Sequence, residues 1–285
     1  MGSFSTSFRL TKLAFGVINK EKELLAYSLI SGICSILVII SFFMFLFGLS
    51  ITGSIPTEES STEFQIFDIV VGFVIYFLLS FITFFFNTAI ITSIPKILEG
   101  KDHTFGEGIR EASKHLGKIA TWAFISAFIS TLLEQIQKRV PGLGKLVISF
   151  LGAAVNIAMY FALPLMILDN RKVGEAIKES PGLFMKGWDT TTLTSVGTSL
   201  FFIVLFFGYM LFLIFLTVLL SSLGYFNVAG ISMAVLLILG VIMLILFSTT
   251  IGSVLKTLLY LNITQGKELD IEDSKVLGEM FKTPK

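Results

Sequence analysis

The chain has 285 residues, of which 54% are hydrophobic and only 14% are charged. Soluble domains carry roughly 25% charged residues, and a chain with a mean hydropathy of +0.87 could not cover its surface with polar groups. The net charge of +1 gives no reason to expect a nucleic-acid partner, and the single cysteine, Cys34, excludes an internal disulfide and a multi-cysteine metal site. We therefore expect a polytopic membrane protein.

The first 22 residues are too polar to enter a membrane but have an amphipathic pattern. A helical spacing places Phe4, Phe8, Phe15 and Ile18 on one face, with Arg9 on the opposite face. This pattern predicts a helix over residues 1–22 that lies on the membrane surface.

Six apolar runs follow, and the third is the least certain in length. Its most apolar part, residues 119–133, is shorter than the roughly 20 residues that a spanning helix needs. It reaches that length when it extends from Leu116 to Ile136, with Lys118 and Glu134 near the two membrane surfaces. We predict a single transmembrane domain over residues 1–285, with spans at about residues 24–49, 69–94, 116–136, 146–168, 193–223 and 228–255, and a cytoplasmic segment over 256–285.

The distribution of Lys and Arg predicts the orientation. With six spans, 18 of the 21 basic residues lie on one side of the membrane, whereas a third run that only dips into the membrane leaves 12. The loop over residues 50–65 is acidic and has no Lys or Arg. The positive-inside rule thus favours six spans in the plasma membrane, with both termini in the cytoplasm.

Two similar hexapeptides indicate an internal repeat. GEGIRE occupies residues 106–111 and GEAIKE occupies residues 174–179. In each case a proline precedes the motif by about ten residues, and an asparagine precedes that proline by eight: Asn87 with Pro95, and Asn156 with Pro164. A fainter third copy is QGKELD at 265–270, which resembles EGKDHT at 99–104. We predict an all-α fold of three pseudo-repeated helical hairpins with interfacial amphipathic helices.

Each hexapeptide has the pattern of a short amphipathic helix. Thr104 and Glu107 fit a capping box at its start, and the apolar stripe in the first copy is Phe105, Ile109, Ala112 and Leu116. In the second copy, Pro181 is expected to break the helix or to begin the next element. These helices either lie on the inner membrane surface or form a docking surface for a protein partner. The candidate contacts with anionic lipid headgroups or with a partner are Arg9, Lys12, Arg110, Lys114 and Lys178.

The N-terminal text SFRLTKLAFGVINKEKELLAYSLISG resembles an uncharacterised prokaryotic integral-membrane family, the domain-of-unknown-function 6159 family. The matching positions are Ser7, Phe8, Leu10, Lys12 and the run 23–25, and the segments at 111–128 and 183–188 are also similar to that family. The resemblance implies a multi-span helical membrane protein and carries over no catalytic residue.

Motifs that would indicate catalysis or cofactor binding are missing from the sequence. There is no phosphate-binding glycine loop, no nucleophile elbow and no HExxH pair, and every Asp lies outside a predicted span or at its edge. We interpret His103 and His115 as solvated surface residues. We therefore expect no enzyme, no cofactor and no metal.

The spans contain neutral polar residues but no charge at their centres, so two functions stay open. The first is a membrane scaffold or accessory subunit, in which these residues join helices with about 1 kcal/mol per contact. The second is a permease or channel for a neutral or weakly charged solute. In either case Asn87 and Asn156 should point inward. The candidate polar seam consists of Asn87, Thr88, Asn156, Thr249, Thr250 and Ser253.

Overall fold

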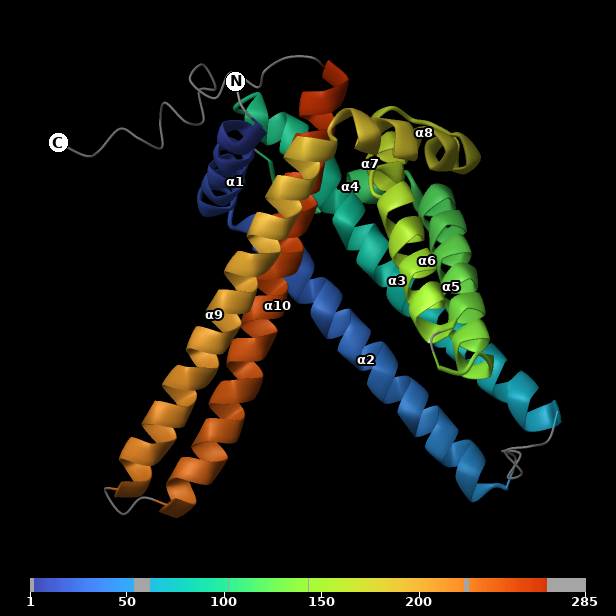
Figure 1. The fold of residues 1–285 in the computed structure, drawn as a ribbon, viewed down its shortest axis with the longest axis vertical. Coiled ribbons are helices and arrows are strands. Elements are labelled where there is room, and N and C mark those ends of the chain that lie inside the picture. Colours follow the sequence, from blue (N-terminus) through green and yellow to red (C-terminus); the bar gives the residue numbers. More distant parts are fainter. Residues whose placement is uncertain (1–2, 54–61, 102, 143, 223–225, 266–285) are drawn as a thin grey trace. The chain divides into compact units, whose positions relative to one another are not determined.

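A computed structural model describes residues 3–53, 62–101, 103–142, 144–222 and 226–265, and every regular element within these ranges is an α-helix (Figure 1). Six helical stretches are long and apolar enough to cross a membrane, which indicates a multi-pass membrane protein. They are Glu23–Ile51, Thr62–Leu98, Leu116–Arg139, Gly144–Leu168, Trp188–Leu220 and Val235–Thr264. The helices are α1 (Ser3–Lys20), α2 (Glu23–Ile51), α3 (Thr62–Leu98), α4 (Phe105–Ser113), α5 (Leu116–Arg139), α6 (Gly144–Ala158), α7 (Ala162–Leu168), α8 (Val173–Lys186), α9 (Trp188–Ser222) and α10 (Phe226–Gln265).

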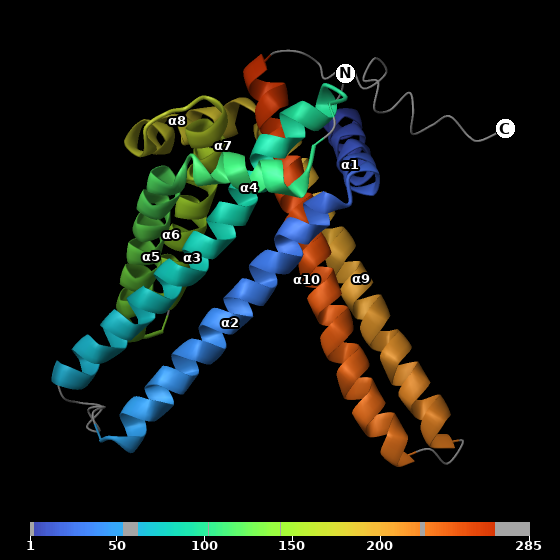
Figure 2. The same cartoon turned by 180° about the vertical axis from the view of Figure 1, so that it is seen from behind.

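The chain forms two compact units. The first contains Met1–Ser28 and Gly187–Lys285, and its helices α9 and α10 form a long antiparallel hairpin on which α1 packs (Figures 1 and 2). The buried side of α1 is Leu10, Leu13, Ala14 and Val17, a helical stripe that Ile18 extends. Of the predicted apolar face, Ile18 is buried, Phe15 is 39% exposed, and the side chains of Phe4 and Phe8 lie outside the described residues. The Phe15 ring meets Phe201 edge to face, with centroids 5.8 Å apart.

A close helix contact fixes the middle of the α9–α10 hairpin. The Tyr209 hydroxyl on α9 donates to the Leu236 carbonyl on α10. The ring passes over Gly240, where a Cβ would clash with the Tyr209 ring. Glycine at position 240 therefore leaves room for this ring, as small residues do in close membrane-helix contacts.

The second unit, Leu29–Lys186, is built around the antiparallel pair α3 and α5. Its two ends carry different contacts. At one end Lys138 on α5 lies 2.8 Å from Asp68 on α3. At the other end the short helices α4, α7 and α8 gather, with α4 on α3 and α8 on α7 (Figure 2). The repeat motifs thus lie at a single end of this unit.

Several predicted spans differ in their bounds from the helices. The fourth was predicted as one helix over 146–168, but it consists of α6 and α7 with a break at residues 159–161. Pro164 favours the break, because its ring clashes with the carbonyl four residues earlier and it has no N–H to continue the hydrogen bonds of the helix. The sixth was predicted to end at 255, whereas α10 continues to Gln265.

Candidate functional site: two anchored amphipathic helices

A left-handed residue ends the span before each amphipathic helix. Gly100 follows α3 with φ +70°, and Asn170 follows α7 with φ 53°. Glycine and asparagine tolerate this conformation better than other residues. In both turns the next N–H reaches back to the helix: Lys101 donates to the Lys96 carbonyl at 3.1 Å and Arg171 to the Leu165 carbonyl at 3.2 Å. The chain therefore leaves both spans by similar turns.

Helices α4 and α8 bury the same positions of the repeated motif. Gly108 and Ala176, the third residues of the two hexapeptides, are both buried. Four residues later, Ala112 and Ser180 are both completely buried. The small residue at each position lets a short helix approach its span closely. The two copies thus agree in register as well as in sequence.

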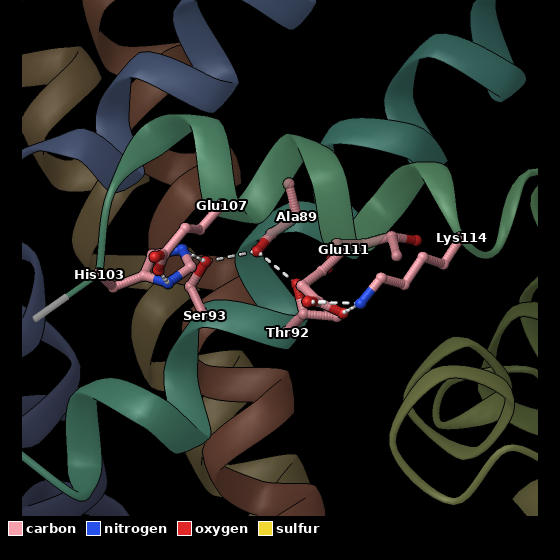
Figure 3. A network of polar contacts seen from close by, with 8 residues as sticks. Ala89, Thr92, Ser93, His103, Glu107, Glu111 and Lys114 are labelled. Atoms are coloured by element: carbon pink, nitrogen blue, oxygen red, sulfur yellow. Dashed lines mark hydrogen bonds and ion pairs between the residues drawn. The ribbon is translucent and has the colours of Figure 1, made fainter. Parts of the chain in front are cut away.

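A buried polar contact holds α4 to α3 (Figure 3). The Ser93 Oγ on α3 lies 2.6 Å from the Nε2 of His103, just before α4, and 2.6 Å from the Ala89 carbonyl oxygen. The Nδ1 of His103 faces the Glu107 carboxylate at 3.6 Å. Only 2% of the His103 side chain is exposed. We call Ser93, His103 and Glu107 the α3–α4 latch.

The hydrogen bonds of the latch assign its protons. The Ala89 carbonyl can only accept, so Ser93 donates its single hydrogen to that carbonyl. Nε2 of His103 must then carry a proton and donate to the Ser93 oxygen. The contact therefore joins α3 to α4.

A second polar contact holds α8 to the break between α6 and α7. The N–H of Phe161, freed by the break, donates to the Ser180 hydroxyl oxygen on α8 at 3.0 Å. The rings of Tyr160, Phe161 and Phe184 pack around this bond, with the closest centroids 4.8 Å apart. Pro181 was expected to end the helix, but it lies within α8, which continues to Lys186.

A lysine joins α5 to the end of α7. The Lys118 Nζ donates to the Met166 carbonyl at 3.0 Å and to the Asn170 side-chain oxygen. A cation at a helix C-terminus satisfies free carbonyls and complements the helix dipole. Asn170 thus ends α7 and also orients the lysine.

The outward sides of α4 and α8 carry charge. Lys114 donates to both Glu111 oxygens, at 2.8 and 2.9 Å, and this hydrogen bond lowers the pKa of Glu111. Burial and the nearby Lys118 charge lower the pKa of His115. Arg110 and Lys178 are exposed, and Arg171 lies 3.5 Å from Glu179. Of the other candidate contacts, Lys12 and Lys114 are exposed, and the Arg9 side chain lies outside the described residues.

The predicted polar seam is divided between the two units. In the second unit, Thr88 is buried and donates to the Phe84 carbonyl on its own helix at 2.8 Å. Asn87 is half-buried beside it, but Asn156 is exposed on α6, so the prediction that both asparagines point inward was wrong. Because α6 ends at Ala158, no continuous helix connects Asn156 to Pro164. The spacing between these two residues therefore does not give the direction of the Asn156 side chain.

In the first unit, two neighbouring threonines of the seam behave differently. Thr250 is buried, and its hydroxyl lies 2.6 Å from the Ser28 hydroxyl on α2. Thr249 is exposed and donates to carbonyls of its own helix at 3.0 Å. Ser253 is half-buried, and its carbonyl accepts from Thr257 at 2.9 Å.

Comparison with known proteins identifies the family. The family of unknown function DUF6159 matches residues 66–269, which is most of the chain. The chain belongs to this family. No curated protein and no solved structure matches it. In this DUF6159 protein the matched part begins near the start of α3 and includes both anchored helices.

Two expectations for the first copy of the motif and its flanking residues were wrong. We predicted His103 to be solvated, but it is 6% exposed because it packs between α4 and Ser93. We also predicted a capping box. Thr104 does occupy the N-cap of α4, but its side chain makes no capping hydrogen bond. Glu107 faces His103 instead of reaching back to the cap. The predicted stripe ends at Ala112, because Leu116 is 44% exposed and begins α5.

Sequence reasoning missed Ser93, Ser180 and Lys118 as helix-joining residues in this DUF6159 protein. The first two carry no signal, since serine is common at helix ends and in spans. Asn170 could have been noticed, because asparagine just after an apolar run is typical of a helix C-terminus.

Proposed function

We propose that this protein is a non-enzymatic membrane scaffold or accessory subunit that presents α4 and α8 to a protein partner at the cytoplasmic face of the plasma membrane. The observation that supports it is the pair of anchored amphipathic helices. Both are fixed by a buried contact, Ser93 with His103 and Phe161 with Ser180. Both leave charged residues exposed, such as Arg110 and Lys178.

The hydrogen bonds that the α3 hydroxyl groups make within the second unit support the same proposal. Thr88, Thr92 and Ser93 each donate to carbonyls of α3 itself, at 2.6 to 3.1 Å. Hydroxyls that bond back to their own helix offer little to a passing solute. In this unit they favour helix packing over a solute path.

Photo-crosslinking in intact membranes tests the scaffold. A photoreactive residue at Lys178 or at Arg110 should give the same discrete protein adduct, because α4 and α8 present related faces. The control site is Val204, an apolar α9 residue that is 70% exposed and should give lipid adducts only. The adduct at 178 should weaken when Ser180→Ala loosens α8. Identical adduct patterns at 178 and 204 would contradict the scaffold.

A second function, a permease or channel for a neutral or weakly charged solute, is favoured by one observation in the first unit. The buried hydroxyls of Thr191, Thr192, Thr194 and Thr198 on α9 have no hydrogen-bond partner among the described residues. A row of such hydroxyls suits water or a hydroxylated solute. Uptake of small polyols into proteoliposomes, with Thr194→Val as the variant, tests this function. Uptake equal to that of empty liposomes would exclude it.

A further inference from the structure

The outer surface of the α3–α5 pair is hollowed at the end away from α4. The hollow has a volume of about 410 Å³, within the range of small-molecule sites. Its walls are aliphatic and aromatic, and the polar groups gather toward the last turns of α5. The lining residues are Ile69, Val70, Phe73, Phe128, Thr131, Leu132, Gln135, Ile136 and Arg139.

The hollow runs along α5 from Phe128 to Arg139. In its wall, the Phe73 ring meets the Phe124 ring edge to face, with centroids 5.3 Å apart. Arg139, the last residue of α5, stands at one end and is exposed. The eleven helical steps from Phe128 to Arg139 rise about 16 Å along a helix. This is about half of a hydrocarbon core roughly 30 Å thick, so the hollow has the depth of one leaflet.

Two neighbouring cations stand at the rim of the hollow, and they differ in their ion pairs. Lys138 lies 2.8 Å from Asp68 and 3.1 Å from Glu134, so both of these carboxylates face it. Arg139 has no ion pair among the described residues. Its planar guanidinium can hold a phosphate by two parallel hydrogen bonds. Gln135, one turn deeper, offers an amide that can donate to an ester oxygen.

We propose that this hollow binds one glycerophospholipid, with an acyl chain along the α3–α5 groove and the phosphate on Arg139. The apolar walls lie at hydrocarbon depth and the cation at headgroup depth, which is the order of the parts of such a lipid. Bulk lipid contacts every apolar face of the protein, whereas this site couples an apolar groove to an arginine that has no ion pair among the described residues. The proposal is independent of the scaffold function.

Native mass spectrometry of the full-length protein in mild detergent tests the site. Delipidated protein is titrated with phosphatidylglycerol, phosphatidylethanolamine or diacylglycerol of the same chains. We expect one phospholipid to bind at least tenfold more tightly than diacylglycerol. Arg139→Gln should abolish this preference, whereas the control Lys145→Gln, which removes an exposed cation outside the groove, should keep it.

A groove-filling variant tests the acyl chain. Val70 lines the groove and is 53% exposed, so Val70→Phe fills it from the wall. Val147→Phe makes the same change on α6, at an exposed position outside the groove. Val70→Phe should reduce phospholipid binding at least fivefold, and Val147→Phe should leave it unchanged. Equal binding by both variants, or an unchanged preference in Arg139→Gln, would overturn the proposal. Thermal unfolding of each variant verifies that it is folded.

Discussion

The hydroxyl of Ser93 and the imidazole of His103 meet at 2.6 Å inside the second unit, ten residues apart in sequence. This contact spans the turn at Gly100 and joins the end of a long apolar helix to the start of an amphipathic one. The second copy of the motif reaches the same result with different atoms, a backbone N–H and Ser180. The repeat therefore preserves the docking of a short helix and not the residues that dock it.

Removing either partner of the α3–α4 latch should destabilise the protein. Ser93→Ala and His103→Ala each leave a buried polar group or a cavity, and we expect a loss of about 1–3 kcal/mol in unfolding free energy. The double variant should lose less than the sum, with a coupling of about 0.5–2 kcal/mol. Denaturation in detergent and hydrogen exchange over α4 measure both effects. Thr92→Val is the control, because its hydroxyl bonds only to its own helix. Strictly additive losses would show that the two residues act separately.

Ser180→Ala should destabilise α8 and the adjoining break. The Phe161 N–H would be left buried without an acceptor, at a cost of about 1–3 kcal/mol. Hydrogen exchange at residues 159–186 should rise while exchange in α9 stays unchanged. Ser199→Ala is the matched control, since Ser199 is exposed and donates to the Ser195 carbonyl of its own helix. Equal effects of the two serine changes would contradict this role for Ser180.

The hydroxyl pair between α2 and α10 gives a third test. Ser28→Ala should lower stability by about 1 kcal/mol, because Thr250 then loses its partner on α2. Thr250→Val in the Ser28→Ala background should cost little more. Thr249→Val removes a neighbouring hydroxyl that bonds only within α10, and it should be close to neutral. A larger loss at 249 than at 250 would refute the assignment.

The sequence predicted the six spanning helices and the two amphipathic helices, because long apolar runs and a repeated hexapeptide are strong local signals. It did not predict the break at residues 159–161. Pro95 and Pro164 occupy equivalent places in the repeat, yet α3 continues through Pro95 and the other helix breaks. The difference depends on Ser180, which accepts the freed Phe161 N–H from a helix that begins later in the chain. Such a tertiary partner has no local signature.

The predictions of where side chains of the candidate site point were wrong for a related reason. The equal spacing of Asn87 and Asn156 from their prolines suggested that both side chains share an inward direction. That inference needs an unbroken helix in both copies, which only α3 provides. His103 was predicted to be solvated because it lies in a segment predicted to be cytoplasmic. Its burial results from the turn at Gly100, which brings it back against Ser93.

Cysteine labelling tests the predicted orientation. Thr52→Cys and Lys172→Cys, each in a Cys34→Ala background, place exposed thiols after α2 and before α8. With six spans and a cytoplasmic N-terminus, an impermeant thiol reagent should label position 52 in intact cells. It should label position 172 only after the membrane is permeabilised. Labelling of both positions from outside would contradict the six-span arrangement, because the three predicted spans between positions 52 and 172 place them on opposite sides of the membrane.

The stability of the protein should decrease as the pH falls below about 6.5, in part because of His115. An unfolded chain gives histidine a pKa of about 6.5. In the folded protein, burial and the positive charges of Lys118 and Lys114 lower the pKa of His115, and the opposing effect of Glu111 is smaller than burial. The unfolded state therefore binds more protons than the folded state between the folded pKa and the unfolded one, so stability rises with pH in that window. His115→Asn keeps a good N-cap residue before α5 and removes the titration. Melting temperatures from pH 7.5 down to pH 5 should fall less steeply for this variant than for the wild type. Parallel curves for the two proteins would show that His115 titrates alike in both states.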